Sequence, residues 1–556
     1  MRALKPMQSP ILVLALTLIQ GPAAASQSLP DSTRVALNRV FATWTSTNGP
    51  GCAAGVSRNG ELVFQNGYGM ANLEHDIPIT PATIFHVASV SKQFTAMAVM
   101  LLAADGKLSL DDDIRKHLPE LPDYGHLITI RHLLTHTSGL RDQWDLLIMA
   151  RGGRFEENRI TEADVLEIVA RQKALNFVPG TEYLYSNTGY TLAGTIVRRV
   201  SGKSLRAFAD ERIFKPLGMS NTHFHDDYNM IVKGKAAGYA RVAGGWRVSL
   251  PNYDTYGATS LFTTVGDLLK WEANHAKPVV GTEPLLRQMA TSATLANGDT
   301  TGYGLGLGVG RYRGVQVISH SGGDAGYRTW SGRAPDHGLA VTVLCNASTA
   351  IPGLLAEQML DELLAGKLEK ATPPFRATLR LTAEQLAPFA GVYQHPLTGA
   401  PQFVTLRRDT LVLGRINGPA LLPISENRFK VQGQPAELEF RPDGSVVQTF
   451  LGSPPRAPLV SKRVAAAAAG KTKAELEQYA GTYQSEELGV TYELVAGDSS
   501  LTIKTRWGVD RNLQPVWGDV FGGAYLVRFT RKGGKIDGFL MSSGRVRGVR
   551  FERASK

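Results

Sequence analysis

Short apolar runs bounded by turn residues mark the expected strands in the first two thirds of the chain. Residues 53–57 and 61–64 flank Arg58-Asn59-Gly60, and this arrangement is typical of a β-hairpin with a tight turn. Residues 338–344 form a continuous apolar run, which indicates a strand that is buried on both faces. The pattern therefore predicts a sheet whose strands lie far apart in the sequence.

Helical spacing alternates with these runs. Phe94, Met97 and Leu101 recur every three to four positions, and Gly106 follows as a helix-ending residue. Residues 353–364 are amphipathic at the same period, which predicts a second helix. Strands and helices together indicate a mixed α/β unit up to about residue 370.

The remaining sequence has a different pattern. Strand-like runs such as 403–406 and 410–413 alternate with Gly, Asn and Asp turns, which predicts a small barrel or sandwich. Residues 476–484 repeat the pattern of residues 386–394, 90 positions later. We interpret the two stretches as copies of one all-β unit.

Length and composition support several globular domains. The chain has 556 residues and is 43% hydrophobic, too long for one core and too apolar for a disordered chain. We assign domains to residues 30–370, 380–462 and 473–556. The 60 basic and 49 acidic residues give a net charge of +11, but they are interspersed, so we expect no nucleic-acid partner.

The N-terminus has the pattern of a secretory signal. Arg2 and Lys5 precede a short apolar stretch at 11–19, and Ala23-Ala24-Ala25 offers small residues for cleavage. We predict a signal peptide over residues 1–25 and a secreted or periplasmic protein. No later apolar run reaches ~18 residues, so we expect no membrane span.

Candidate chemistry begins at Ser89, which precedes Lys92 by three positions at the start of the first predicted helix. Residues three apart share one face of a helix, so the amine can reach the hydroxyl. A serine hydroxyl becomes a nucleophile when a neighbour takes its proton, and lysine can do so when its pKa is lowered. On its own, Ser-x-x-Lys is weak evidence, because chance produces it in long chains.

Two further motifs follow. Tyr185 and Asn187 come after a turn signal and could supply a phenol that shares a proton and an amide that contacts substrate. His320, Ser321, Gly322 and Gly323 enter a predicted strand, where the imidazole could carry positive charge or donate a hydrogen bond. The glycines would let a substrate approach the strand edge, with the Gly323 N–H as an oxyanion donor beside the N–H of Ser89.

Together the three motifs resemble those of the penicillin-recognising serine hydrolases: Ser-x-x-Lys, Tyr-x-Asn and Lys/His-x-Gly, in that order. That family includes class C β-lactamases, D-alanyl-D-alanine carboxypeptidases, D-aminopeptidases and related esterases. The surrounding stretches 86–95 and 133–140 match as well, so the resemblance covers roughly residues 30–367. It implies an α/β fold of the β-lactamase/transpeptidase type, with an antiparallel sheet flanked by helices and a helical lobe.

The resemblance also implies roles. Ser89 would be the acylated nucleophile, Lys92 its proton partner, Tyr185 the general base and acid, and Asn187 a substrate contact. His320 stands where the β-lactamases have lysine. The first and last strands of the family sheet are neighbours, so Cys52 and Cys345 are candidates for a disulfide. No metal and no cofactor is expected.

The trailing β segments are similar to the two lipocalin-like barrels of three-domain D-aminopeptidases. Residues 138–144 and 546–549 strengthen that likeness. Those enzymes carry a long loop of the last domain into the active site. The corresponding stretch at 518–523 is short here, and this departure bears on specificity for a free N-terminal D-residue.

The sequence thus predicts a secreted serine hydrolase that forms an acyl-enzyme on Ser89. Its substrates would be D-amino-acid peptides, amides or small esters. Two alternatives remain open: a β-lactamase, and a sensor that binds penicillin or peptidoglycan with little turnover. Peptidoglycan is accordingly a candidate partner alongside small substrates.

Overall fold

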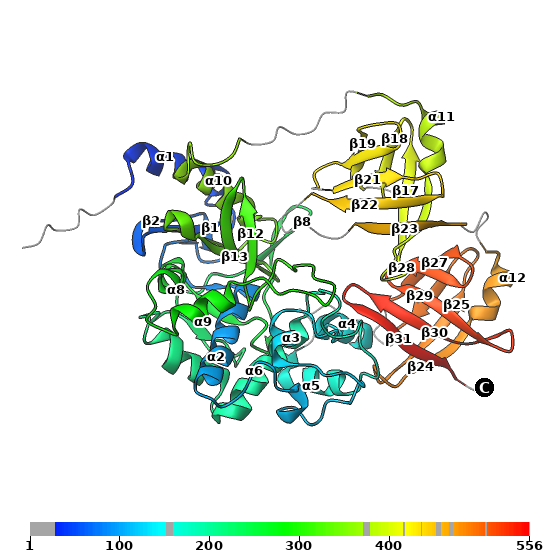
Figure 1. Cartoon of the computed structure of the whole chain (residues 1–556), viewed down its shortest axis with the longest axis horizontal. Coiled ribbons are helices and arrows are strands. Elements are labelled where there is room, and N and C mark those ends of the chain that lie inside the picture. The colour runs from blue at the N-terminus through cyan, green and yellow to red at the C-terminus, as the bar shows by residue number, and fades with distance from the viewer. Residues whose placement is uncertain are drawn as a thin grey trace, which may run out of the picture.

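The computed structural model describes residues 28–151, 159–370, 379–414, 418–434, 436–451, 458–465, 471–505 and 509–554. The predicted signal peptide at 1–25 lies outside the described residues. An α/β part, blue to green in Figure 1, is followed by one closed barrel in yellow and another in orange to red. Within the described ranges, no helix combines the length and the apolar character that crossing a bilayer requires.

A six-stranded antiparallel sheet in the order β12-β13-β14-β15-β1-β2 organises the α/β part. The predicted hairpin is present, and Asn59 and Gly60 at its turn have φ of 51° and 84°, as a tight hairpin turn requires. The first strand pairs with the last, which places Cys52 opposite Cys345, and these two cysteines form a disulfide. The strands are β1 (Cys52–Arg58), β2 (Glu61–Tyr68), β12 (Gly308–Tyr312), β13 (Val315–Asp324), β14 (Tyr327–Ala334) and β15 (Leu339–Cys345).

Helices cover both faces of this sheet. Side chains alternate along a strand, so Ala54 and Val343 pack against α1 (Asp31–Val40) and α10 (Pro352–Leu363). Ala53 and Leu344 point to the opposite face, which α8 (Val265–Ala276) covers. This two-sided burial explains why β15 is a continuous apolar run.

The helical lobe is centred on α2 (Lys92–Ala104), which contains the predicted 94–101 helix. All but its last two residues are buried, and Gly106 follows it with φ of 70°. The other helices of the α/β part are α3 (Ile130–Leu134), α4 (Gln143–Arg151), α5 (Glu162–Ala170), α6 (Asn187–Ser201), α7 (Leu205–Ala209) and α9 (Glu283–Met289). Short strands complete it: β3 (Met70–Asn72), β4 (Ile77–Pro78), β5 (Phe85–His86), β6 (Ile160–Thr161), β7 (His223–Phe224), β8 (Tyr239–Val242), β9 (Gly245–Val248), β10 (Tyr253–Asp254) and β11 (Leu261–Thr263).

Both trailing segments close into barrels of eight strands. Of the two architectures expected from the sequence, a barrel or a sandwich, the barrel is confirmed. Each barrel follows a one-turn helix with a capping box, at Thr382 and at Thr472, 90 positions apart. The helices are α11 (Ala383–Leu386) and α12 (Lys473–Leu476). The first barrel comprises β16 (Gly391–Gln394), β17 (Pro401–Arg407), β18 (Thr410–Leu413), β19 (Ala420–Pro423), β20 (Arg428–Val431), β21 (Ala436–Phe440), β22 (Ser445–Phe450) and β23 (Leu459–Val464). The second comprises β24 (Gly481–Ser485), β25 (Val490–Ala496), β26 (Leu501–Lys504), β27 (Arg511–Trp517), β28 (Val520–Gly523), β29 (Leu526–Lys532), β30 (Lys535–Ser543) and β31 (Val546–Arg553).

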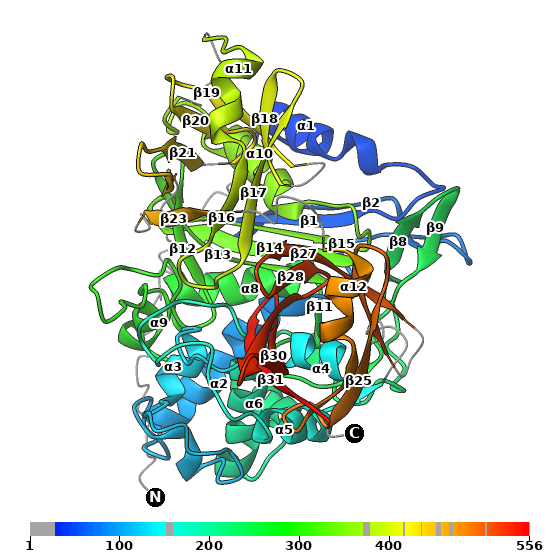
Figure 2. The same cartoon turned by 90° about the vertical axis from the view of Figure 1, so that its right-hand side faces the viewer.

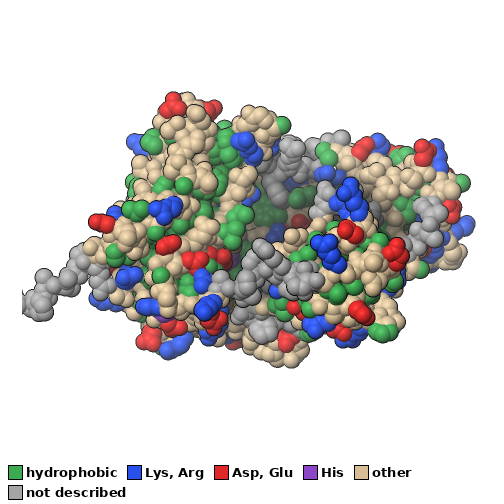
Figure 3. Space-filling view, turned by 90° about the horizontal axis from the view of Figure 1, so that it is seen from above, with side chains coloured by type: hydrophobic (Ala, Val, Ile, Leu, Met, Phe, Trp, Pro, Cys, Tyr) green, Lys and Arg blue, Asp and Glu red, His purple; other side chains and the backbone are tan. Residues whose placement is uncertain are grey.

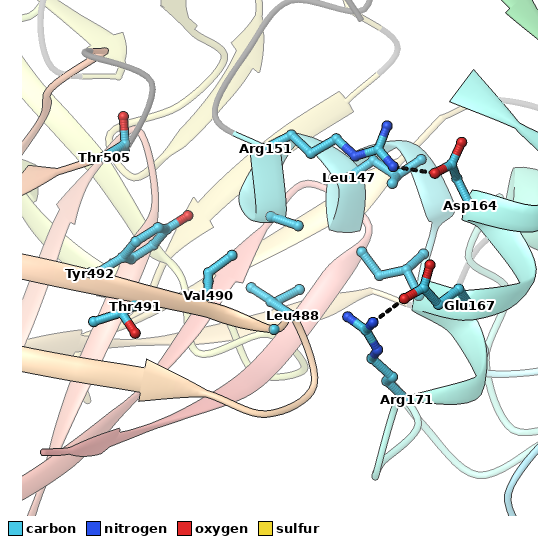
Figure 4. Close-up of a pocket in the computed structure, with 13 residues that line it drawn as sticks. Leu147, Arg151, Asp164, Glu167, Arg171, Leu488, Val490, Thr491, Tyr492 and Thr505 are labelled. Carbon is cyan, nitrogen blue, oxygen red and sulfur yellow. Dashed lines mark hydrogen bonds and ion pairs between the residues drawn. The ribbon is translucent and has the colours of Figure 1, made fainter. Parts of the chain in front are cut away.

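The last barrel packs against the helical lobe, with β31 beside α4 in Figures 1 and 2. The Tyr492 hydroxyl of β25 donates to the carbonyl oxygen of Met149 in α4. A cavity of about 440 Å³ lies in this interface, between α4, α5 and β25. Figure 4 shows the side chains that line it. Arg151 and Arg171 on its wall form ion pairs with acidic residues of α5, so its charges are already matched.

Seen from above, a hollow with hydrophobic side chains in its wall separates the α/β part from the barrels (Figure 3). Basic and acidic side chains are scattered over both sides of that hollow. The interspersed charges of the sequence therefore leave this face without a patch of one sign.

Candidate active site

Ser89 lies in a 3-10 turn, Ala88–Ser91, that runs directly into α2. Ala88 has φ of 48°, a left-handed conformation that non-glycine residues rarely adopt. The Ser91 hydroxyl holds the turn, because it donates to the Ala88 carbonyl at 2.5 Å and accepts from the N–H of Leu261 at 3.0 Å. Local strain thus accompanies a fixed position for the serine.

Lys92 is fully buried behind Ser89, one helical turn along. Its Nζ lies 3.0 Å from Ser89 Oγ and 2.9 Å from Asn187 Oδ1. A third contact, of 2.7 Å, is to the carbonyl oxygen of Ala258. Burial lowers the pKa of the Lys92 amine well below its usual 10.5, so the structure favours the uncharged amine.

The three contacts of Nζ are all to oxygen atoms. The amide oxygen of Asn187 and the carbonyl oxygen of Ala258 can only accept, so each takes an N–H group of Lys92. Lys92 Nζ also donates to the Ser89 hydroxyl, which, unlike the other two partners, can donate in turn when the amine is uncharged. The serine is therefore the one of the three partners that can exchange a proton with Lys92.

Tyr185 is half-buried on the cavity wall, with its ring centroid 4.8 Å from Lys92 Nζ. Burial raises the pKa of its hydroxyl above the usual 10, and the hydrogen bond to Ser89 opposes this only in part. The phenol therefore stays protonated in the resting site and is available to donate a proton.

His320 lies on β13 behind Tyr185 and does not line the cavity. Its Nδ1–H donates to the carbonyl oxygen of Ser321 at 2.6 Å, and Nε2 accepts from the Tyr303 hydroxyl at 2.8 Å. Burial and, secondarily, the nearby Lys92 lower the pKa of His320 from 6.5 to about 3. Of the two roles open from sequence, the structure favours an uncharged hydrogen-bonding imidazole over a positive charge.

The glycines beyond His320 bring the strand close to Ser89. Gly323 lines the cavity with Ser89, whereas Ser321 and Gly322 do not. A Cβ on Gly322 would overlap the carbonyl oxygen of Val87 and the hydroxyl of Thr329. Glycine is therefore required where β13 packs on the turn that carries Ser89.

The cavity at Ser89 measures about 490 Å³, a size typical of sites for small molecules. Four of the predicted site residues line it: Ser89, Tyr185, Asn187 and Gly323. The sequence analysis missed the rest of the wall, which includes Trp144, Asp145, Tyr253, Asp324, Arg328 and Arg545. They come from four separate stretches of chain, and only Trp144 falls in a stretch that the sequence analysis singled out, 138–144.

The charged residues on the wall have partners of their own. Asp324 accepts from the Tyr253 hydroxyl and lies 3.1 Å from His86 Nε2. Asp145 accepts from the backbone N–H of Arg545 at 2.6 Å, and burial raises the pKa of its carboxyl. The cavity wall thus combines carboxylates with the rings of Trp144 and Tyr253, whose centroids lie 5.2 Å apart.

Asp142 is a second residue that the sequence analysis left without a role. It is fully buried, and its Oδ2 accepts from the backbone N–H of Asn187 at 2.7 Å and from the Asn187 side chain at 3.0 Å. Its Oδ1 accepts from Arg545 Nη2 at 3.2 Å. The available signal was the 138–144 stretch, which contains Asp142.

Arg545 belongs to the turn between β30 and β31, so the last barrel does reach the site. It does so through this hairpin, whereas the 518–523 stretch, which comprises the short turn between β27 and β28 and β28 itself, does not line the cavity. The two stretches that resembled D-aminopeptidases contact each other: Arg141 donates to the carbonyl oxygens of Arg547 at 3.0 Å and Gly548 at 3.1 Å.

Comparison with known proteins agrees with this geometry. The sequence pattern of the family described as Beta-lactamase matches residues 37–365. A D-aminopeptidase of Gluconobacter oxydans (strain 621H) is 26% identical over 526 residues, 91% of this chain and 96% of that protein.

Solved structures share the fold. A penicillin-binding protein homologue from Pyrococcus abyssi, described as octameric, is 26% identical and superposes with a TM-score of 0.56, covering 77% of this chain and 99% of that one. A D-amino acid amidase from Ochrobactrum anthropi SV3 is 24% identical with a TM-score of 0.50, over 60% of this chain and 98% of that one.

Proposed function

The chain belongs to the beta-lactamase family, and on this premise we propose that it is a serine hydrolase of the D-aminopeptidase type that works through an acyl-enzyme on Ser89. One observation carries the proposal: the buried Lys92 Nζ lies 3.0 Å from Ser89 Oγ and is held there by contacts to Asn187 Oδ1 and the carbonyl oxygen of Ala258. A base within hydrogen-bond distance of a hydroxyl is the arrangement that activates a serine.

The proton path follows from the pKa directions. The Ser89 proton passes to Lys92 as Oγ bonds to the substrate carbonyl carbon, and the backbone N–H groups of Ser89 and Gly323 stabilise the oxyanion. The carbon–nitrogen bond then breaks, and the leaving amine takes a proton from the Tyr185 hydroxyl. The Lys92 ammonium returns that proton to Tyr185. Water, deprotonated along the same path, hydrolyses the ester on Ser89.

The wall of the cavity supports a charged substrate. The carboxylates of Asp145 and Asp324 both line the cavity, and either could receive the ammonium of an N-terminal residue. Trp144 and Tyr253 offer ring surface on the same wall. Together with the likeness to the Gluconobacter D-aminopeptidase, this supports short peptides or amides of D-amino acids as substrates.

The test is turnover of a panel of D-amino-acid amides, their L-enantiomers, D-Ala-D-Ala peptides, short-chain esters and nitrocefin. The proposal predicts preference for D-amides, loss of turnover in Ser89→Ala, and a serine-directed phosphonate that labels the Ser89 peptide. Equal turnover by a folded Ser89→Ala variant would refute it. Rapid nitrocefin turnover would favour a β-lactamase, and a stable adduct without turnover would favour a sensor.

We further propose that residues 1–25 direct export to an oxidising compartment. The disulfide between Cys52 and Cys345 supports this, because such bonds persist outside the reducing cytosol. N-terminal sequencing of protein from the periplasm and the medium would test it. A mature chain that retains Met1 and stays in the cytosol would contradict the proposal.

A further inference from the structure

We propose that Arg545 of the last barrel is a positioning residue that acts on Lys92 through Asp142 and Asn187. The inference rests on the proposed function, because it takes Ser89 as nucleophile and Lys92 as its base. It assigns the C-terminal barrel a part in catalysis, in addition to its packing on the helical lobe.

An unbroken series of hydrogen bonds connects the barrel to the nucleophile. Arg545 Nη2 donates to Asp142 Oδ1 at 3.2 Å, and Asp142 Oδ2 accepts both N–H donors of Asn187, at 2.7 and 3.0 Å. Asn187 Oδ1 lies 2.9 Å from Lys92 Nζ, which lies 3.0 Å from Ser89 Oγ. Because Asp142 accepts from the amide nitrogen of Asn187, it fixes the amide oxygen toward the lysine.

The hairpin that carries Arg545 is held in place by the α/β part. The backbone N–H of Arg545 donates to Asp145 Oδ2 at 2.6 Å, and the carbonyl oxygen of Arg545 accepts from Asn176 Nδ2 at 2.8 Å. Gly544 has φ of 48°, and a Cβ there would lie 2.6 Å from Asp145 Oδ2. The turn therefore fits closely, and the guanidinium enters the site from a fixed backbone.

Charge explains why an arginine is needed. Asp142 is a buried carboxylate with two cationic candidates within reach, Lys92 and Arg545. A buried charge is costly without a partner of opposite sign. Since Arg545 supplies that partner, Lys92 is free to remain an uncharged amine. Without Arg545, the carboxylate would favour the lysine ammonium, which cannot accept the serine proton.

The other groups around Lys92 do not reverse the direction in which Arg545 shifts the pKa of the Lys92 amine. Asp142 and Asp324 raise the pKa of Lys92, whereas burial and Arg545 lower it. The remaining titratable neighbours are uncharged near neutral pH, since burial lowers the pKa of both histidines and raises the pKa of both tyrosines. They are His136, Tyr185, Tyr190 and His320.

The test compares Arg545→Met with Arg545→Lys in the full-length protein, using a D-amino-acid amide as substrate. We expect Arg545→Met to lower kcat about tenfold and to move the acidic limb of the kcat–pH profile about one unit to higher pH, because one pKa unit is a tenfold change in protonation. Arg545→Lys keeps the charge, so its limb stays near that of the wild type. The control is Lys173→Met, which removes an exposed ion pair with Glu486 in the same interface and should leave kcat and the limb unchanged.

Asp142→Asn supplies the reciprocal measurement. Removal of the carboxylate charge should move the acidic limb of the kcat–pH profile to lower pH. Combination of Asp142→Asn with Arg545→Met should return the limb toward its wild-type position. A merely structural role of Arg545 would not produce these opposite shifts. An Arg545→Met enzyme with wild-type kcat and limb overturns the inference. If Arg545→Met fails to fold, an unmoved limb in Asp142→Asn overturns it. A folded, active Ser89→Ala variant would instead refute the proposed function itself.

Discussion

A buried ion pair between Arg141 and Glu487 is expected to hold the last barrel on the helical lobe. The Arg141 side chain is 1% exposed and that of Glu487 is 5% exposed, so water screens neither charge. Arg141 also donates to Gln172 Oε1 at 2.8 Å and to the carbonyl oxygens of Arg547 and Gly548. These other partners are uncharged. Among the groups named here, Glu487 therefore supplies the counter-charge of the Arg141 guanidinium.

Glu487 is equally committed to this position. Its carboxylate accepts from the backbone N–H of Lys173 at 2.9 Å and from that of Arg550 at 3.2 Å, besides the bond from Arg141. Glu487→Gln keeps the shape and an acceptor oxygen but removes the charge. The variant therefore leaves the Arg141 guanidinium buried without a counter-charge.

The expected cost follows from that burial. Removal of one partner of a buried pair typically destabilises a protein by about 3 to 5 kcal/mol. Glutamine retains an acceptor oxygen, and Arg141 keeps three neutral partners. We therefore expect Glu487→Gln to cost roughly 3 kcal/mol, near the lower end of this range. The apolar double variant Arg141→Met/Glu487→Leu leaves no unpaired charge, so it should lose less than the sum of its single variants.

Urea unfolding measures this loss, with limited proteolysis as a second probe because a three-part chain need not unfold in one step. Lys173→Met is the control, since its ion pair with Glu486 is exposed and should contribute nothing measurable. A loss below about 1 kcal/mol in Glu487→Gln, or additive losses in the double variant, would refute the reasoning.

Three further predictions follow from the fold and the site. Joint replacement of Cys52 and Cys345 by serine should lower the melting temperature without changing kcat, since the bond closes a separation of 293 residues far from Ser89; an unchanged melting curve would contradict this. Gly322→Ala should abolish turnover, because its Cβ would overlap the carbonyl oxygen of Val87, and wild-type kinetics would argue against that packing. In the unfolded chain His320 binds a proton below pH 6.5, whereas in the folded protein its buried imidazole binds one only near pH 3. The free energy of unfolding therefore falls as the pH drops through this window. His320→Gln should flatten that fall in acid titrations of unfolding, and identical slopes would exclude the contribution.

Much of the fold could be predicted from local patterns. The 53–57 and 61–64 runs pair as β1 and β2, and the 94–101 spacing lies within α2, because apolar runs, helical spacing and turn residues are all local features of the chain. The repeat at 386–394 and 476–484 begins two closed barrels. Closure itself was not predictable from the residues, since it depends on the pairing of β16 with β23 and of β24 with β31, each pair separated by most of its domain.

Part of the site was equally local. Ser89 and Lys92 meet because three residues make nearly one helical turn, and the spacing of Tyr185 and Asn187 places both at the start of α6. His320 was found by its motif, but its charge state depends on burial that no motif records. The wall residues Asp145 and Arg545 lie 400 positions apart, and only the docked barrel brings them together.

The sequence by itself therefore determined the pairing of Ser89 with Lys92 and the kinds of domain, because these depend on short-range spacing and hydrophobic period. The tertiary structure alone decided that Lys92 is buried, which lowers the pKa of its amine, and that the last barrel brings Arg545 to the cavity at Ser89. Both depend on the dielectric surroundings and on contacts between remote segments. These arise only when the chain has packed, since burial sets the cost of a charge and long-range packing sets which partner meets it.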